Sequence, residues 1–394
     1  MSKVKFLDLG SQPIANNFLD NKSKIKNEYK FNLSVVFDEE TKLVSLESFV
    51  QPELMFNDSY VYYSSLSKTM RSHFYDTANL LKKDFSPKNV LEIGSNDGVF
   101  LKNFPFNTTI SVEPCGNFAR ITTAMGYTTY SKFWTKGLSE TITTKHGKQD
   151  LIFSANCMCH IQDLKSAFAS VSRSLSPTGV FVFEDPSLLK MMERGSYDQI
   201  YDEHAHMFSV TALQNLLKNS GLEIFKVQNI TVHGGSNRIF ACPEGTRKID
   251  RSVRENLDRE ENAGLGNIDA YIRFSEKVSQ SKTQLVQVLS ELKRKGCKIV
   301  SYGATSKLTT VFNYCQIGTD LIDYIVDTTY DKQGKLSPGM HIPVISPEEG
   351  FDSTVDFAFL GAWNYEKEIL SNEKEFLNNG RFISHVPYVR FIKN

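Results

Sequence analysis

Short apolar segments recur along this chain between helical stretches, and this alternation constrains the fold more than any other feature. In the middle of the chain the strand candidates are NVLEIG, TTISVEP, DLIFSAN and GVFVFED. Continuous apolar runs are typical of parallel strands that helices cover on both faces. EIFKVQNI and NRIFACP follow, and the glycines of HGGS between them predict an antiparallel ribbon at the sheet edge. The sequence therefore predicts an α/β domain with a Rossmann-like, largely parallel sheet.

Two further regions flank this sheet. The N-terminal region is rich in turns and polar residues and contains the aromatic run YVYYSS. After a charged helical stretch at about 248–295, KIVSYGATSK begins a second unit, and LIDYIVD, PVISPEE and VDFAFLGAWN are further strand candidates. This alternation predicts a second open parallel sheet. We therefore expect an N-terminal lobe (1–70), a central domain (71–245) and a C-terminal α/β domain (246–394).

Charge and hydropathy limit the partners and the location. Lys plus Arg and Asp plus Glu both number 45, so the formal net charge is zero and no long-range field gathers nucleic acid. The chain shows no apolar core of signal-peptide length and no run near the roughly 18 apolar residues of a spanning helix. We expect a cytoplasmic protein without a nucleic-acid or membrane partner. The six cysteines form no C-x-x-C pair, which predicts reduced core thiols.

The most specific local motif is VLEIGSNDG, at 90–98, where a buried strand ends and a helix begins. Gly94 lets the backbone turn sharply, and Gly98 lets a ligand or a neighbouring element approach closely. The spacing G-x-x-x-G differs from the G-x-G-x-x-G of dinucleotide-binding domains. Glu92 and Asp97 flank the turn, where carboxylates disfavour a pyrophosphate but suit a ligand with a cationic amine. We therefore predict S-adenosylmethionine as the cofactor and not NAD.

Three later positions extend this predicted cofactor site. The next strand ends at Glu113, about 20 residues further along, where a carboxylate can accept both ribose hydroxyls. Phe133 or Trp134 offers an apolar face for adenine, although either could be a core residue. Asn156 ends DLIFSAN and could position ligand groups at the carboxyl edge of the sheet. The predicted cofactor contacts are Glu92, Gly94, Asn96, Asp97, Gly98, Glu113, Phe133 and Asn156.

A polar cluster, YDQIYDEHAHMF at 197–208, follows the strand that ends in FEDP. Histidines titrate near neutrality and adjacent carboxylates can orient them, so the cluster predicts general acid–base catalysis. Its tyrosines can donate hydrogen bonds to an oxyanion. A metal site at His204 and His206 is the weaker alternative, since the spacing is not that of H-E-x-x-H and no third ligand is evident. A solvated surface helix is the structural alternative.

Methyl transfer to carbon is the reaction that needs such a cluster. A carbon next to a carbonyl must lose a proton before it attacks a methyl sulfonium, and donors must stabilise the enolate. Transfer to an acidic hydroxyl or to an amine needs less assistance. The cluster therefore favours carbon methylation, and an oxygen or nitrogen methyltransferase is the alternative.

The sequence resembles the nucleotide-deoxysugar C-methyltransferases over nearly its whole length. The likeness is carried in order by LDLGSQPIANNF, YVYYSS followed by Ser67 and His73, LEIGSNDG, FEDP, YDQIYDEH, HGGSNR, SYGATSK and KQGKLSPG. The resemblance implies an N-terminal lobe, a central S-adenosylmethionine domain and a C-terminal nucleotide-sugar domain. It also implies that His204 is the base, with Tyr201 and Glu203 beside it. Relatives act next to the ketone of 4-keto-deoxysugars, usually linked to dTDP, and the resemblance favours a monomer.

The resemblance implies substrate contacts in all three regions. The aromatic run would line the sugar pocket, with a half-buried aromatic strand as the alternative. The HGGSNR turn would bring its histidine or its arginine to the cleft, although that arginine could be a surface charge. The glycine turn of SYGATSK leads into a helix start whose backbone N–H groups and lysine suit a pyrophosphate. The predicted substrate contacts are Tyr60, Tyr62, Tyr63, His233, Arg238, Ser306, Lys307 and Lys335, with Lys332, Pro338 and Gly339 as further candidates.

One departure from this family concerns its N-terminal lobe, which usually carries two zinc-binding cysteine pairs. No pair precedes Leu7, and Asp38 and Thr41 stand where the second pair is expected. Because zinc affinity depends on thiolates, we predict a lobe folded without zinc. The missing ligands suggest a non-catalytic nucleotide-sugar-binding protein as a further alternative, but the intact LEIGSNDG and YDEH segments favour an enzyme.

Overall fold

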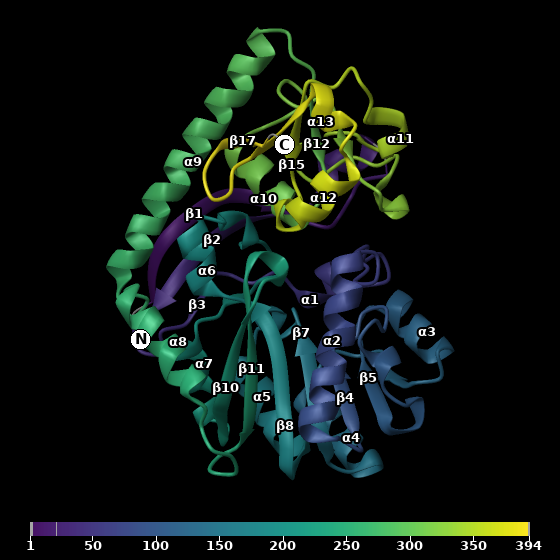
Figure 1. The fold of residues 1–394 in the computed structure, drawn as a ribbon, viewed down its shortest axis with the longest axis vertical. Coiled ribbons are helices and arrows are strands. Elements are labelled where there is room, and N and C mark those ends of the chain that lie inside the picture. The colour runs from purple at the N-terminus through teal and green to yellow at the C-terminus, as the bar shows by residue number, and fades with distance from the viewer. Residues whose placement is uncertain (1–2, 21, 393–394) are drawn as a thin grey trace.

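The computed structural model describes residues 3–20 and 22–392, and its strands form three sheets (Figure 1). In this view the C-terminal sheet lies above the central one, and the long helix α9 (Ile268–Arg294) runs along one side of the molecule. Among the described residues, no helix has the length and apolarity needed to traverse a lipid bilayer. The predicted fold class, α/β with two Rossmann-like sheets, is confirmed.

The central domain holds a seven-stranded sheet with the order β10-β11-β8-β7-β4-β5-β6. Strands β8 to β6 in this order are parallel, and β11 and β10 form the predicted antiparallel ribbon at one edge. Its strands are β4 (Val90–Ile93), β5 (Thr109–Val112), β6 (Thr128–Tyr130), β7 (Gln149–Ala155), β8 (Leu175–Pro186), β10 (Leu222–Ile230) and β11 (Ser236–Pro243).

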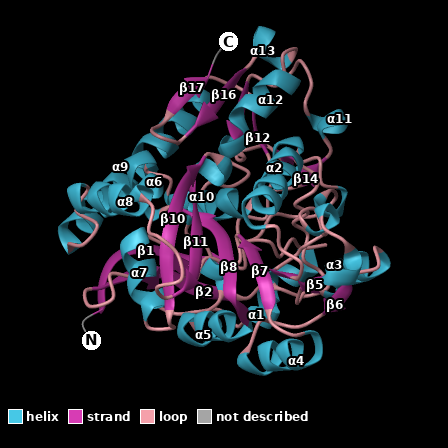
Figure 2. Ribbon diagram, turned by 60° about the horizontal axis from the view of Figure 1, so that its bottom comes forward, coloured by secondary structure: helices cyan, strands magenta, loops and turns pink. Residues whose placement is uncertain are grey.

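Helices cover both faces of this sheet, which explains its continuous apolar strands. In β4, Leu91 and Ile93 pack in the core that α4, α5 and α7 build, whereas Val90 packs in the core on the α2 side. Successive side chains of a strand point to opposite faces, so every position of β4 is buried. Figure 2 shows α4 and α5 on one side of the sheet. The helices are α2 (Lys68–Phe85), α3 (Gly116–Ala124), α4 (Lys136–His146), α5 (Leu164–Ser174), α6 (Leu188–Arg194) and α7 (Val210–Lys218).

The C-terminal domain holds a six-stranded sheet with the order β14-β13-β12-β15-β16-β17, parallel except for β17. Its last two strands, β16 and β17, were not predicted. The strands are β12 (Ile299–Tyr302), β13 (Ile325–Val326), β14 (Val344–Ile345), β15 (Phe357–Leu360), β16 (Arg381–Ser384) and β17 (Arg390–Ile392). The helices are α10 (Ser306–Cys315), α11 (Pro347–Gly350), α12 (Glu366–Asn372) and α13 (Phe376–Asn379).

The N-terminal lobe is an antiparallel sheet of β1 (Lys3–Pro13), β2 (Lys30–Asp38) and β3 (Val44–Leu46), followed by the short α1 (Pro52–Met55). Its fourth strand, β9 (His206–Met207), comes from the polar cluster and pairs with β3. The lobe is therefore not built from its own first 70 residues alone.

Two structural alternatives of the sequence analysis are wrong. The aromatic run at 60–65 forms a loop and no strand. The polar cluster is no solvated surface helix, because it folds as a 3-10 turn (Tyr197–Gln199), further turns and β9, and all of residues 197–208 are buried.

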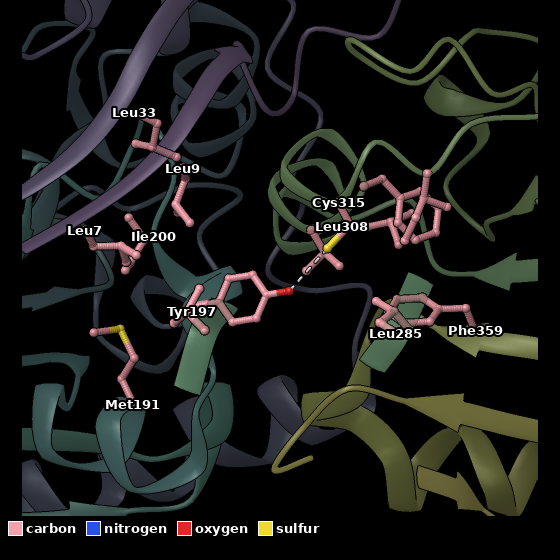
Figure 3. Packing of buried hydrophobic residues seen from close by; sticks show 14 of the residues in the cluster. Leu7, Leu9, Leu33, Met191, Tyr197, Ile200, Leu285, Leu308, Cys315 and Phe359 are labelled. Atoms are coloured by element: carbon pink, nitrogen blue, oxygen red, sulfur yellow. Dashed lines mark hydrogen bonds between the residues drawn. The ribbon is translucent and has the colours of Figure 1, made fainter. Parts of the chain in front are cut away.

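The polar cluster is buried because it lies where the parts of the molecule meet. One hydrophobic core joins Leu7 and Leu9 of the lobe, Tyr197 of the cluster, and Leu308 and other residues of the C-terminal domain. Figure 3 shows the Tyr197 ring between these groups, with its hydroxyl directed at a cysteine of α10. The helical stretch at 248–295 is two helices, α8 (Arg251–Asn262) and α9, and α9 belongs to the same core.

Candidate active site

A cavity of about 370 Å³ opens at the carboxyl ends of β4, β5 and β7, the edge where doubly wound sheets bind their ligands. Its lining includes acidic groups, Glu92 and Glu113, and the aromatic side chains of Phe133 and Trp134. Trp134 is also anchored in the core, since its Nε1 donates to the carbonyl of Ala167. The predicted residues that line this cofactor cavity are Glu92, Gly94, Asn96, Glu113, Phe133 and Asn156.

The glycine turn brings the backbone close to this cavity. Gly94 has φ +75°, and a Cβ atom there would lie 2.7 Å from the Sγ of Cys157, so only glycine fits. The two oxygens of Glu113 accept the backbone N–H groups of Asn96 at 2.7 Å and Cys115 at 2.8 Å. These bonds orient the carboxylate and leave its remaining lone pairs for a ligand.

The carboxylates that line this cavity fit a ligand that carries a cationic group. Glu92 is buried, and its Oε2 has no hydrogen-bond partner in the described part of the chain. Burial, together with the charges of Glu113 and Asp97, raises the pKa of Glu92 well above its usual range. A bound ammonium group would offset this cost. The residues present therefore fit S-adenosylmethionine. Its methionine end would face the carboxylates, and its adenine would pack against Phe133 and Trp134.

Asp97 and Gly98 are placed away from this cavity and support its surroundings. The carboxylate of Asp97 accepts the N–H of Ser65 at 3.0 Å, and the neighbouring Asn96 side chain accepts the N–H of Ser64 at 2.9 Å. These bonds fasten the aromatic loop to the glycine turn. A Cβ at Gly98 would meet a side chain of α3 at 3.1 Å, so this glycine serves helix packing.

A second cavity, of about 310 Å³, lies between the central and C-terminal domains. Many of the predicted catalytic and substrate residues line it: Tyr60, Tyr62, Tyr63, Tyr201, Glu203, His204, His233, Ser306, Lys307 and Lys332. Among the described residues, five line both cavities: Tyr60, Tyr62, Asn156, His160 and His233. The two cavities therefore adjoin, and these five residues form the boundary between them.

The hydrogen bonds of His204 define its tautomer. Its Nδ1 lies 2.6 Å from the backbone carbonyl of Gln199, which can only accept, so Nδ1 carries the proton. Nε2 is then an acceptor and receives the hydroxyl of Tyr201 at 2.8 Å. Burial lowers the pKa of His204 well below its usual range, with further lowering by His160 and Lys307. His204 is therefore a neutral imidazole, and its basic nitrogen accepts a hydrogen bond from the Tyr201 hydroxyl.

Glu203 does not orient His204, contrary to the expectation of an adjacent carboxylate. Its two oxygens accept hydrogen bonds from the Asn16 amide at 2.6 Å and the Tyr60 hydroxyl at 2.8 Å. The neighbouring Asp202 accepts the backbone N–H of Ala15 at 3.0 Å. The segment SQPIANNF of the lobe thus supports the polar cluster, and a backbone carbonyl orients the histidine.

His160 belongs to the same site, although the sequence analysis did not single it out. Its ring stacks on His204, with centroids 5.4 Å apart, and on Phe56, with centroids 5.3 Å apart. Burial lowers the pKa of His160 to about 3, so it is also neutral. Its position just after β7 was the available signal, because the carboxyl ends of parallel strands converge on one edge.

The geometry does not favour a metal ion at this cluster. Donor atoms of Cys159, His160 and His204 lie within 4.8 Å of one another. However, both nitrogens of His204 are hydrogen-bonded, and the two rings are stacked at 25°, so their in-plane lone pairs do not converge. The other ligand considered from the sequence, His206, bonds Ser45 of the lobe at 2.9 Å.

The first turn of α10 opens onto the second cavity. Thr305 caps the helix, and Ser306 and Lys307 follow at its N-terminus. Burial lowers the pKa of Lys307, while the charges of Asp198 and Glu203 oppose this shift. By contrast, the ammonium group of Lys332 is committed to the protein, since it donates to a backbone carbonyl of this turn at 2.8 Å.

Three candidate substrate contacts are placed elsewhere. Arg238 is buried within the central sheet, where its guanidinium donates to Glu184 at 2.6 Å and to two further side chains. Lys335 lies 3.5 Å from Asp20, and the N–H of Gly339 donates to Glu28 at 2.8 Å. None of these three is among the residues lining the second cavity, so the geometry does not support them as substrate contacts.

A carboxylate closes the turn where the resemblance places a cysteine pair. Asp38 accepts the backbone N–H groups of Glu40 and Thr41, both at 3.0 Å. The first cysteine of the sequence is Cys115, so the lobe offers no thiolate. These residues do not fit a zinc ion, and a lobe folded without zinc stays a prediction.

Comparisons with known proteins match all three regions. Family models described as "C-methyltransferase C-terminal domain", "Methyltransferase domain" and "Putative zinc binding domain" match residues 231–387, 70–227 and 1–56, respectively. The C-methyltransferase NovU of Streptomyces niveus is 32% identical over 393 residues, which cover 98% of this chain and 93% of NovU.

Solved structures also resemble the chain. An S-adenosylmethionine-dependent methyltransferase of Clostridium acetobutylicum is 15% identical, with a TM-score of 0.36, and the match covers 44% of this chain and 92% of that one. A methyltransferase of Thermotoga maritima is 19% identical, with a TM-score of 0.34, and the match covers 44% and 91%.

Proposed function

Because this chain belongs to the S-adenosylmethionine-dependent C-methyltransferases, we propose that it methylates the carbon next to the ketone of a nucleotide-linked keto-deoxysugar, with His204 as general base. The observation that carries this proposal is the neutral His204 in the wall of a cavity that adjoins the cofactor cavity. Such a cavity accepts a substrate with an acidic carbon beside the methyl donor. Membership in this family speaks against both alternatives, the oxygen or nitrogen methyltransferase and the pure binding protein.

The cofactor supplies an electrophilic methyl group when bound. The chain's own contribution on this side is binding: Glu92 and Glu113 receive the polar groups, and the aromatic side chains of Phe133 and Trp134 exclude water.

Proton removal falls to Tyr201 and His204. The hydroxyl of Tyr201 donates a hydrogen bond to Nε2 of His204. The Tyr201 oxygen therefore takes the α-proton while its own proton passes to His204. The carbonyl of Gln199 accepts the Nδ1–H bond of the resulting imidazolium and so stabilises it. Since His204 is a weak base in its buried site, the enolate must be stabilised by other groups.

The nucleotide side is assigned to the C-terminal domain. The N-terminus of α10 presents backbone N–H groups to the second cavity, and Ser306 and Lys307 add a hydroxyl and a cation. This combination suits a pyrophosphate. The aromatic loop with Tyr60, Tyr62 and Tyr63 also lines this cavity, and a deoxysugar would lie against it.

The test is proton–deuterium exchange at the α-carbon, followed by NMR across a panel of dTDP- and UDP-linked 4-keto-sugars. We expect exchange with at least one of them, and methyl transfer when S-adenosylmethionine is added. His204→Asn should lower both rates by about three orders of magnitude and keep S-adenosylmethionine binding in calorimetry. An Asn variant that methylates at the wild-type rate would refute the assignment of His204.

A further inference from the structure

If the proposed function holds, the boundary between the two cavities must contain a hydrogen-bond donor as well as a base. The reacting carbon loses its proton to the Tyr201–His204 pair and takes a methyl group from the cofactor cavity, so it lies at this boundary. The ketone oxygen is two covalent bonds away and lies there too. When the carbon–hydrogen bond breaks, its electron pair forms the enolate, and negative charge develops on that oxygen. A buried hydrogen-bond donor must face it.

Most boundary residues already have other partners. The Tyr60 hydroxyl donates to Glu203, and the Tyr62 hydroxyl interacts with Tyr365. The Nε2 of His160 is also buried without a hydrogen-bond partner among the described residues, but its ring is stacked between Phe56 and His204, on the side of the base. Asn156 ends β7, where its backbone N–H donates to a carbonyl of β8, and its side-chain amide has no hydrogen bond among the described residues.

His233 has no such commitment. No hydrogen bond or ion pair of its ring occurs within the described residues, and its Nε2 is buried without a partner. Burial lowers the pKa of His233 to about 3, with Lys307 adding to the effect, so the ring is neutral. A neutral imidazole carries one N–H donor. The pKa of this N–H group is closer to the pKa of an enol than the pKa of an imidazolium is, so the neutral ring matches the enolate better as a hydrogen-bond donor.

The backbone holds this ring in place at a cost. His233 has φ +53° and ψ +25°, the left-handed region that is uncommon for residues other than glycine. The two glycines that follow are tightly packed: a Cβ at Gly234 would lie 2.3 Å from Trp363, and a Cβ at Gly235 would lie 3.0 Å from Lys190. Backbone strain of this kind persists where the surrounding structure over-determines it, and it clusters at functional sites.

We infer that His233 donates a hydrogen bond to the ketone oxygen of the substrate and stabilises the enolate. The proton of His233 stays on its nitrogen throughout. The α-proton moves to the Tyr201–His204 pair. The electron pair of the enolate then forms the new carbon–carbon bond while the methyl–sulfur bond of the donor breaks and leaves its electron pair on sulfur, and the carbonyl re-forms. His233 is thus a catalytic residue distinct from the base.

The left-handed backbone provides a sharp test. Glycine adopts this conformation without strain, so His233→Gly removes the ring and preserves the turn. We expect a melting temperature equal to or above that of the wild type, unchanged calorimetric binding of S-adenosylmethionine and of dTDP or UDP alone, and α-exchange slower by about 10²–10³-fold. His233→Asn tolerates the same backbone and supplies an N–H donor, so it should retain more activity than the glycine variant.

His341 supplies the matched control. It is also a left-handed histidine, with φ +55°, but its ring bonds Glu28 between the lobe and the C-terminal domain. His341→Gly should therefore leave the exchange rate unchanged. Exchange by His233→Gly within about twofold of the wild type would overturn the inference and leave the proposed function intact. A wild type that exchanges no keto-sugar of the panel would overturn the proposed function itself.

Discussion

The imidazole rings of His160 and His204 stack with their centroids 5.4 Å apart, and His160 also lines the cofactor cavity. One aromatic ring therefore separates the proposed base from the space for the methyl donor. The stack holds a small buried ring in a fixed orientation, and Phe56 packs on the far side of His160. The precision of the site depends on this column of three rings.

The ring stack can be tested without altering His204, the proposed base. Phenylalanine at position 160 preserves an aromatic ring, whereas alanine removes it. An aromatic pair contributes about 0.5–1.5 kcal/mol, so we expect His160→Ala to lower kcat by up to about tenfold and His160→Phe to retain most of it. Steady-state kinetics with saturating cofactor measure this difference. Equal losses in both variants would instead indicate a chemical role for the His160 nitrogens.

Glu113 should govern cofactor affinity and local stability together. Its carboxylate accepts two backbone N–H groups and lines the cofactor cavity, so Glu113→Ala leaves both donors unpaired. Loss of a charged acceptor costs about 1.5–3 kcal/mol, which corresponds to 10- to 100-fold weaker S-adenosylmethionine binding in calorimetry, with a lower melting temperature. Glu140→Ala on the exposed face of α4 is the control, and binding at wild-type strength by Glu113→Ala would contradict the assignment.

The N-terminal lobe should hold no zinc. Asp38 closes the turn where the family places a cysteine pair, and no thiolate is available in the lobe. We expect elemental analysis of purified protein to find far less than one zinc per chain, and treatment with EDTA to leave the melting temperature unchanged. Near-stoichiometric zinc, lost together with stability on chelation, would refute this.

Asp185 should make stability fall as pH rises. Burial raises its pKa to about 7 in the folded protein, above the value of about 3.9 in an unfolded chain. Between these two values the folded state holds a proton that the unfolded state has lost. The free energy of unfolding contributed by Asp185 therefore decreases by about 1.4 kcal/mol per pH unit and levels off above the folded pKa.

Asp185→Asn removes this titration and keeps the shape of the side chain. Urea unfolding between about pH 5 and pH 8 should show a flatter pH dependence for the variant, and a stability advantage over the wild type at the alkaline end. Asp76→Asn at an exposed position of α2 should reproduce the wild-type profile. Parallel profiles for Asp185→Asn and the wild type would contradict the shifted pKa.

Sequence patterns predict the two large sheets because their strands are buried on both faces and therefore read as continuous apolar runs. The lobe gives no such signal, since β1 has two register shifts against β2 and the sheet is completed by β9 from far along the chain. Local spacing also misplaces residues whose partners are distant. Arg238 forms a hydrogen bond with Glu184 on the neighbouring strand, and Asp97 forms one with the aromatic loop. Neither interaction can be predicted from the residues adjacent in sequence.

The same limit explains why the sequence predicts only part of the polar cluster at 197–208. The residue types at 201–204 indicate acid–base chemistry, but the orienting group of His204 is a backbone carbonyl, which every residue possesses. His160 was missed because a single histidine after a strand is a weak signal until the fold brings it beside another ring.

His206 and Met207 pair with β3, and this pairing attaches the segment of His204, the proposed base, to the sheet of the lobe. Any scheme that grafts a foreign lobe onto this chain to change its substrate must therefore transplant the β9 dipeptide as part of the lobe. A chimaera joined only near residue 70 would disrupt the pairing between β3 and β9 and displace the His204 ring. Loss of activity in such a chimaera would therefore reflect the disrupted strand pairing and not a change in substrate specificity.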